Sequence, residues 1–155
     1  MMDTPQQAKL ETPSKTVDRF FESIGWKPFR FQRSTWRAYR DGSSGLVHSA
    51  TGTGKTLAVW LGPTLKWLDE NRDRQKWQPK RPPGLRVLWV TPLRALAGDT
   101  EASLRQPLDQ MDLPWKLESR TGDSKASAKA RQLKRLPTAL ITTPESLSLM
   151  LTHEK

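Results

Sequence analysis

The sequence predicts an α/β domain in which a parallel sheet carries helices on both faces. Two observations lead to this fold class. Short apolar runs of strand character alternate with stretches of helical periodicity along the chain. A glycine-bearing loop also stands between the first of these runs and the helical stretch that follows it. We expect residues 14–155 to form one domain, preceded by a flexible arm at residues 1–13.

The first half of the chain contains three predicted helices and one predicted strand. Residues 14–24 place apolar side chains at helical spacing, and Gly25 is a plausible stop. Residues 29–40 repeat this trend. A strand is expected at 45–50, followed by the glycine-bearing loop. The next helix is expected to start near Gly54 and to be kinked or interrupted at Pro63.

The second half of the chain continues the alternation after a charged, proline-rich stretch. Residues 69–84 show no periodicity and predict an exposed loop. Residues 85–91 predict a buried strand. The further predicted elements are a helix at 92–105, a strand at 115–120, a basic helix at 124–136, a strand at 139–142 and a helix at 144–151.

Tryptophan is frequent, with seven residues in the chain. Five of them fall in apolar patterns and are expected in the core: Trp36, Trp60, Trp67, Trp89 and Trp115. Trp77 lies in the charged stretch and is expected to be exposed. His48 and His153 stand alone, without a second ligand at metal spacing, so neither receives a metal role.

The charge balance favours a polyanionic partner. Lys and Arg number 26 against 16 Asp and Glu, which gives a formal net charge of +10. Such an excess is typical of nucleic-acid binding, although an anionic membrane surface or plain solubility charge would also explain it. The chain contains no Cys, which excludes disulfides and thiolate metal sites. No run is long enough to span a membrane, and the polar start is no secretory signal, so we expect a cytoplasmic protein without a membrane partner.

The loop between the first strand and its helix has the residues of a phosphate cradle. Its sequence is Ser49-Ala50-Thr51-Gly52-Thr53-Gly54-Lys55-Thr56. Backbone N–H groups of such a loop bind phosphate oxygens, assisted by the dipole of the new helix. Lys55 is expected to reach the β- and γ-phosphates and the Thr56 hydroxyl to coordinate Mg²⁺, which makes these two the candidate catalytic residues. Ser49 replaces the usual first glycine, but the remaining spacing argues against an ordinary Gly/Thr-rich turn.

Parallel strands would bring three further loops to one edge of the sheet. These loops lie at Thr91-Pro92, Thr121-Gly122 and Thr143-Pro144, each directly after a predicted strand. Ligands of open α/β sheets collect at the edge where the strands end. We therefore expect a binding surface there.

These loops together resemble the motifs of superfamily-two helicases. The phosphate loop resembles motif I, Thr91-Pro92-Leu93-Arg94-Ala95-Leu96 resembles motif Ia, and Thr142-Thr143-Pro144-Glu145-Ser146-Leu147 resembles motif Ib. Arg120-Thr121-Gly122-Asp123 is similar to the glycine segment between the last two. Phe29-Arg30-Phe31-Gln32, taken with these segments, looks most like the Lhr-type branch, and within it the ligase-associated DEXH-box helicases. The resemblance covers residues 16–153.

The resemblance implies a RecA-like first motor domain that binds ATP and Mg²⁺ and acts on single-stranded DNA or a DNA duplex. Gln32 stands where this family has an adenine-reading glutamine, and its amide offers a donor and an acceptor that match adenine. Phe29 is expected to pack either on the base or in the core. The expected nucleotide contacts are Phe29, Gln32, Ser49, Thr51, Gly52, Thr53, Gly54, Lys55 and Thr56.

The three loops supply the expected nucleic-acid contacts. Hydroxyl, guanidinium and backbone N–H donors hold phosphates and sugars without reading sequence. The expected contacts are Thr91, Pro92, Leu93, Arg94, Thr121, Gly122, Asp123, Thr143, Pro144, Glu145 and Ser146. Helix N-capping is an alternative and compatible use of each threonine. Residues 116–135 also carry seven basic residues against two acids, which fits either a solvated face or a nucleic-acid contact.

A helicase of this class also needs an Asp-Glu-x-His segment and a second motor domain, and neither is found in the sequence. We therefore expect the chain to be an N-terminal part of the first motor domain that binds nucleotide but hydrolyses almost none alone. A DNA ligase or repair protein as partner, and a place near the bacterial nucleoid, rest on the resemblance. The alternatives are a small P-loop kinase or GTPase, for which further signature segments are missing, and a non-catalytic nucleic-acid-binding module.

Overall fold

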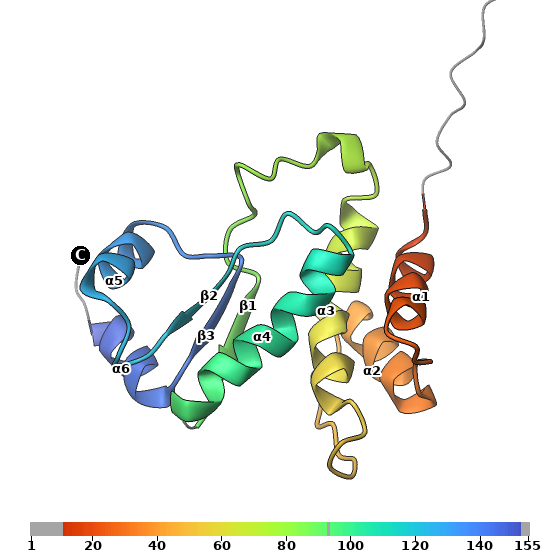
Figure 1. Cartoon of the computed structure of the whole chain (residues 1–155), viewed down its shortest axis with the longest axis horizontal. Helices are drawn as coiled ribbons and strands as arrows, with labels where there is room; N and C mark the ends of the chain where they lie inside the picture. Colours follow the sequence, from red (N-terminus) through yellow and green to blue (C-terminus); the bar gives the residue numbers. More distant parts are fainter. Residues whose placement is uncertain (1–10, 93, 153–155) are drawn as a thin grey trace, which may run out of the picture. The chain divides into compact units, whose positions relative to one another are not determined.

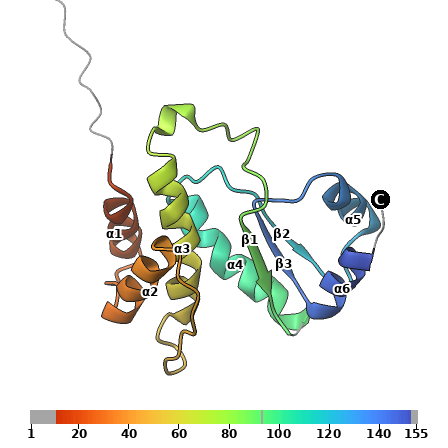
Figure 2. The same cartoon turned by 180° about the vertical axis from the view of Figure 1, so that it is seen from behind.

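The structure is a computed structural model that describes residues 11–92 and 94–152, with the side chains of residues 93–96 left out. The chain divides into two compact units, Met1–Trp77 and Gln78–Lys155. Figures 1 and 2 show the elements of both units from opposite sides.

The first unit is helical. It contains α1 (Pro13–Ser23), α2 (Arg30–Arg40), α3 (Lys55–Glu70) and a short 3₁₀ helix at Arg74–Lys76. The hydroxyl of Thr12 accepts the N–H of Lys15 and caps α1. Gly25 follows the helix with a φ of +71°, the left-handed conformation that commonly ends helices. The three predicted helices of this half are thus confirmed, with ends that differ by a residue or so.

The core of the first unit is aromatic. The ring of Phe21 lies 5.3 Å from Phe20 and 5.8 Å from Trp36, and all three side chains are buried. The indole of Trp36 also donates a hydrogen bond to the Leu57 carbonyl at 3.2 Å, which joins α2 to α3. Gly62 permits the close approach of these two helices, because a Cβ at this position would lie 2.9 Å from Cγ of Tyr39.

Helix α3 runs through Pro63 without a break, so the expected alternative of an interruption there is wrong. Proline removes one helical hydrogen bond, but packing on both sides of it holds the helix together. Leu61 and Leu65 are buried, and the hydroxyl of Thr64 donates to the Leu61 carbonyl at 2.9 Å. Tertiary contacts therefore outweigh the local cost of the proline.

The predicted strand at residues 45–50 is wrong. These residues form no regular element, and the side chain of Leu46 is 92% exposed. A strand is stable only when its N–H and C=O groups pair with a neighbour. The described residues of this unit contain no extended segment that pairs with it, so the apolar pattern alone does not make a strand.

The second unit is an α/β layer structure. Its elements are β1 (Val87–Val90), α4 (Arg94–Gln110), β2 (Leu117–Arg120), α5 (Ala126–Lys134), β3 (Ala139–Thr142) and α6 (Pro144–Thr152). The strands form a parallel sheet in the order β1-β3-β2. Helix α4 lies on one side of the sheet, and α5 and α6 lie on the other (Figures 1 and 2). The predicted fold class, a parallel sheet with helices on both faces, is confirmed.

Strand β3 is the buried centre of this sheet, and all four of its residues are buried. The expectation of a buried strand at 85–91 is wrong for β1, which is shorter and lies at the edge of the sheet. Leu88 is 43% exposed and Val90 is 45% exposed. An edge strand has a neighbour on one side only, so its apolar sequence does not ensure its burial.

The tryptophans follow the predicted pattern with two exceptions. Trp36, Trp60, Trp67 and Trp115 are buried, as expected, whereas Trp89 on the edge strand is half-buried. Trp77 is also half-buried rather than exposed. Its ring lies 5.1 Å from that of Trp67, and its indole N–H donates to the Asn71 carbonyl at 2.9 Å. The expected loop at 69–84 is correspondingly more ordered, since it contains the end of α3 and the 3₁₀ helix.

Glu118 joins β2 to α5. Its carboxylate accepts hydrogen bonds from Arg131 at 2.8 Å and from Gln132 at 2.9 Å, and it forms an ion pair with Lys116 at 2.8 Å. Burial acts to raise the pKa of Glu118. The hydrogen bonds from Lys116 and Gln132, with the charges of Lys116 and Arg131, outweigh burial and lower this pKa below its ordinary value of 4.5. Glu118 is therefore ionised at neutral pH.

We expect Gly62→Ala to destabilise the first unit by about 1–3 kcal/mol, because the added methyl group overlaps the Tyr39 ring. Gly98→Ala in α4 is the matched control, since a Cβ there meets nothing within 4 Å. The control should be stabilising by about 0.5–1 kcal/mol through the helix preference of alanine. Urea unfolding followed by circular dichroism measures both, and a Gly62→Ala protein as stable as the control would contradict the packing described for α2 and α3.

Candidate nucleotide and nucleic-acid sites

The phosphate loop of the first unit adopts a conformation that requires glycine at two positions. Gly52 has a φ of +76° and Gly54 a φ of +82°, both in the left-handed region. Gly54 is the N-cap of α3, so Lys55 and Thr56 begin the helix. The hydroxyl of Thr53 donates to the Ala50 carbonyl at 2.8 Å and lies 2.7 Å from the Ser49 hydroxyl. The loop is therefore closed on itself and ends at a helix N-terminus.

The ammonium group of Lys55 lies against this loop. Its Nζ donates hydrogen bonds to the carbonyls of Ser49 at 2.8 Å and Ala50 at 2.5 Å. Thr51, Gly52 and Thr56 are exposed. A cation and a helix N-terminus thus meet beside exposed backbone, which is the electrostatic environment that favours bound phosphate.

Gln32 supports the phosphate loop from α2. Its side chain is 1% exposed, its Oε1 accepts the N–H of Phe29 at 2.8 Å, and its Nε2 donates to the Gly54 carbonyl at 3.0 Å. A Cβ at Gly54 would lie only 2.6 Å from this Nε2. The sequence did not predict this positioning role, although a glutamine three residues after a helix N-cap is a known capping signal.

Phe29 is 58% exposed, and its ring stacks on that of Phe31 at 6.1 Å. The expectation that Phe29 packs in the core is therefore wrong, and the ring is free to meet a planar group. Because Gln32 holds both the Phe29 N–H and the Gly54 carbonyl, one side chain brings this aromatic ring and the phosphate loop together.

The second unit brings the three predicted loops to one edge of its sheet. Val90 and Arg120 are both in register with Thr142, so β1, β2 and β3 end side by side. The Thr91 N–H donates to the Thr142 carbonyl at 2.9 Å, and the Thr142 hydroxyl donates to the Arg120 carbonyl at 2.8 Å. We call the described loop residues that follow these strands, at 91–92, 121–123 and 143–146, the rim. Their predicted placement at one edge is confirmed.

The residues of the rim differ in how far they are exposed to solvent. Pro92, Gly122, Asp123, Pro144 and Glu145 are exposed. Thr121 is half-buried. Leu93 and the side chain of Arg94 lie outside what the structure describes.

Three hydroxyl residues of the rim are buried: Thr91, Thr143 and Ser146. Thr143 caps α6, since its hydroxyl accepts the Ser146 N–H at 3.4 Å and lies 3.3 Å from the Ser146 hydroxyl. The capping alternative is thus confirmed for Thr143. These hydroxyls therefore lie beneath the surface of the rim. The surface itself is formed by backbone groups and exposed side chains.

The predicted site residues thus form two sets. The nucleotide set lies in the first unit and the nucleic-acid set in the second. Within the described residues, no group of three or more His, Asp or Glu side chains could hold a metal ion. The described part of the chain also contains no helix that is both long and apolar enough to cross a lipid bilayer.

The family model for DEAD/DEAH box helicases matches residues 29–155 of the chain. The chain belongs to this family. Among curated relatives, the Lhr helicase/uracil glycosylase of Escherichia coli is 30% identical over 98% of the chain and 11% of its own length. The ATP-dependent helicase Lhr-Core of Sulfolobus acidocaldarius is 33% identical over 100% of the chain and 18% of its own length. The chain therefore spans about a tenth to a fifth of the length of these relatives.

Solved structures of helicases are similar to the structure of this chain. Mycobacterium smegmatis helicase Lhr bound to ssDNA and AMP-PNP superposes with a TM-score of 0.71 at 32% identity, over 94% of the chain and 18% of that protein. DEAD-box helicase Mss116 bound to ssRNA and UDP-BeF superposes with a TM-score of 0.66 at 22% identity, which shows the shared fold alone. The fold is thus that of the RecA-like helicase motor domains.

Replacing Gln32 tests its support of the phosphate loop. We expect Gln32→Ala to weaken binding of both ATP and GTP by about tenfold, because two hydrogen bonds that order Phe29 and Gly54 are lost. Titration calorimetry measures both affinities. Ser34→Ala, at an exposed position of the same helix, is the control. Unchanged GTP binding with weakened ATP binding would instead assign Gln32 to adenine recognition alone.

Proposed function

We propose that the chain is the nucleotide-binding part of the first motor domain of an Lhr-type, ATP-dependent helicase that acts on single-stranded DNA. One observation supports this proposal above all. The ammonium group of Lys55 bonds to a loop carbonyl at the start of α3, and Gly52 and Gly54 of this loop have left-handed backbone conformations. Family membership supports it, as do the relatives named ATP-dependent helicases.

The loop binds the phosphates of ATP through its backbone. The first N–H groups of α3 have no partner within the helix and are available to phosphate oxygens. Lys55 leaves the carbonyls of Ser49 and Ala50 and moves its ammonium group onto the β- and γ-phosphates. In this arrangement Lys55 acts catalytically, by stabilising charge on the group that is transferred.

The exposed Thr56 hydroxyl fits a Mg²⁺ site. It is an oxygen donor beside the phosphate loop, and Mg²⁺ in nucleotide sites commonly takes one or two protein oxygens with phosphate oxygens and water. When bound, the ion would neutralise phosphate charge. Thr56 is the only residue that we assign to it.

The adenine base is proposed to lie against Phe29. The exposed Phe29 ring offers a stacking surface, and Gln32 sets its position relative to the loop. Because the Gln32 side chain is 1% exposed, we assign the adenine contact to the Phe29 ring, and Gln32 positions this ring and the loop.

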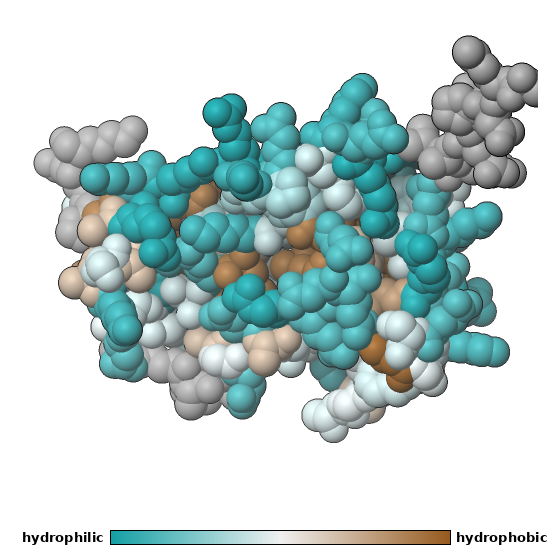
Figure 3. Space-filling model, turned by 45° about the horizontal axis from the view of Figure 1, so that its top comes forward, coloured by the Kyte–Doolittle hydropathy of each residue, from teal (hydrophilic) through white to brown (hydrophobic). Residues whose placement is uncertain are grey.

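The rim is proposed to hold the DNA backbone. Its exposed backbone groups, the start of α6 and Arg94 supply donors for phosphates, and the net charge of +10 favours a polyanion. The surface shown in Figure 3 is predominantly hydrophilic. A bacterial cytoplasmic location near the nucleoid, and a DNA ligase or repair protein as partner, are proposed from the motif resemblance.

Lys55→Ala should weaken ATP binding by about 100-fold or more, because the main cation of the phosphate site is lost. Binding of single-stranded DNA in the absence of nucleotide should be largely retained. Lys76→Ala is the control, since this exposed lysine of the first unit carries the same charge and lies on the 3₁₀ helix. Fluorescence titration with a labelled ATP analogue measures the effect, and equal affinities of wild type and variant would refute the nucleotide site.

Arg94→Ala should weaken DNA binding equally for all base sequences and flatten its salt dependence by about one phosphate contact. Anisotropy titrations with several single-stranded oligonucleotides at a series of salt concentrations measure both quantities. Arg37→Ala, an exposed arginine of α2, is the control. A loss confined to particular sequences would contradict recognition of the backbone.

A further inference from the structure

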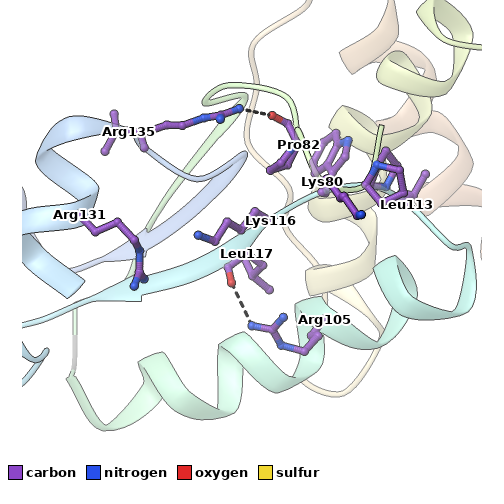
Figure 4. A pocket seen from close by; sticks show the side chains of 12 residues that line it. Lys80, Pro82, Arg105, Leu113, Lys116, Leu117, Arg131 and Arg135 are labelled. Atoms are coloured by element: carbon purple, nitrogen blue, oxygen red, sulfur yellow. Dashed lines mark hydrogen bonds between the residues drawn. The ribbon is translucent and has the colours of Figure 1, made fainter. Parts of the chain in front are cut away.

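The second unit has a pocket at the edge of the sheet where its strands begin, which is the edge opposite the rim. We call it the basic pocket. Its volume is about 550 Å³. Five of the side chains that line it are cationic: Lys80, Arg105, Lys116, Arg131 and Arg135. They come from the coil before β1, from α4, from β2 and its approach, and from α5 and the segment after it (Figure 4).

A buried threonine joins the segments that enter the three strands at this edge. Thr138, which is fully buried before β3, donates its hydroxyl to the Pro83 carbonyl at 2.7 Å. The same hydroxyl accepts the N–H of Lys116 at 3.2 Å. The Thr138 carbonyl accepts the N–H groups of Arg86 and Val87. The segments that enter the strands, including the one that carries Lys116, are therefore tied together.

Two of the arginines are oriented by neutral carbonyls. Arg135 donates to the Pro82 carbonyl at 2.9 Å, and Arg105 donates to the Leu117 carbonyl at 3.0 Å (Figure 4). Such hydrogen bonds orient a guanidinium group without neutralising its charge. Arg105 also pairs with Glu101 at 2.6 Å.

Lys116 and Arg131 share one acid. Both lie 2.8 Å from the same oxygen of Glu118, and both side chains remain about half exposed. The five cations of the basic pocket therefore face two nearby acids, Glu101 and Glu118. The pocket keeps an excess of positive charge, which is the electrostatic requirement for an anionic ligand.

Helix α5 connects the basic pocket with the rim. Lys129, in the middle of the helix, donates to the carbonyl of Gly122 in the rim at 2.7 Å. Arg131, two residues further along, and Arg135, directly after the helix, line the pocket. The nine residues of α5 span about 13 Å, so one helix contacts both the rim and the pocket.

We propose that the basic pocket binds backbone phosphate of the same nucleic acid that the rim holds, and so forms a second contact on the motor domain. The proposal rests on the proposed function, because the rim is taken to bind the strand. Continuity along α5 favours nucleic acid over an acidic peptide, which would need no connection to the rim. The proposed contact is to the phosphate backbone, so it carries no sequence preference.

The test compares a short oligonucleotide of about three nucleotides, which is too short to cover the rim and also reach the pocket, with a long one of about twenty that does both. Lys116→Ala combined with Arg131→Ala should weaken binding of the long strand by about tenfold and flatten its salt dependence. Binding of the short strand should be unchanged. Lys134→Ala, an exposed lysine of α5 outside the pocket, is the matched control and should have a smaller effect.

Glu118→Gln is the second variant and should act in the opposite direction. It removes the acid shared by Lys116 and Arg131 but keeps an oxygen that accepts the Gln132 amide. We expect binding of the long strand to strengthen by about threefold, because two cations lose their internal partner. Circular dichroism verifies that each variant is folded.

Each outcome of this test is decisive. The proposal is wrong if the double variant weakens binding of the long and the short strand equally. It is also wrong if Lys134→Ala weakens binding of the long strand as much as the double variant does, because the positive charge would then act as a diffuse surface charge. A polyglutamate peptide that competes with the long strand in wild type and not in the double variant would reassign the pocket to a protein partner. If neither oligonucleotide binds, the proposed function fails instead.

Discussion

Parallel pairing of β1 and β2 with the buried strand β3 is the constraint on which the second unit depends. Because all three strands run in the same direction and in register, the segments that enter them meet at one edge and those that leave them meet at the other. The rim and the basic pocket are therefore two consequences of one pairing scheme. Thr142 and Thr138, at the two ends of β3, bond to the neighbouring segments and fix both edges.

Much of this arrangement could be predicted from the sequence, because local signals and tertiary context agree there. The strand at 139–142 and the helix that follows Thr143 have the expected bounds, since a short apolar run and a proline at the first helical position both favour them. The segments around residue 46 and β1 show the limit. Both are apolar, but burial depends on which neighbours pair with a strand, and this information is not local.

In the candidate sites, too, some features follow from the local sequence and others depend on packing. Spacing alone identified the phosphate loop, because Gly52, Gly54 and Lys55 meet conformational and electrostatic demands that few other residues satisfy. The hydrogen bond of Gln32 to Gly54, 22 residues further along the chain, could not be predicted, since it requires the packing of α2 on α3. The partial burial of Trp77 likewise results from its contacts with Asn71 and Trp67, which the charged sequence around it does not reveal.

The bonds of the Lys55 ammonium to two carbonyls of its own loop have a thermodynamic consequence. In the proposed nucleotide complex, this group exchanges two carbonyl acceptors for phosphate oxygens, so the gain in enthalpy is the difference between the two sets of hydrogen bonds. The side chain is restrained in both arrangements, so little rotamer entropy is lost on association. Selectivity among anions would then depend on how much better than a peptide oxygen each anion satisfies this positive charge.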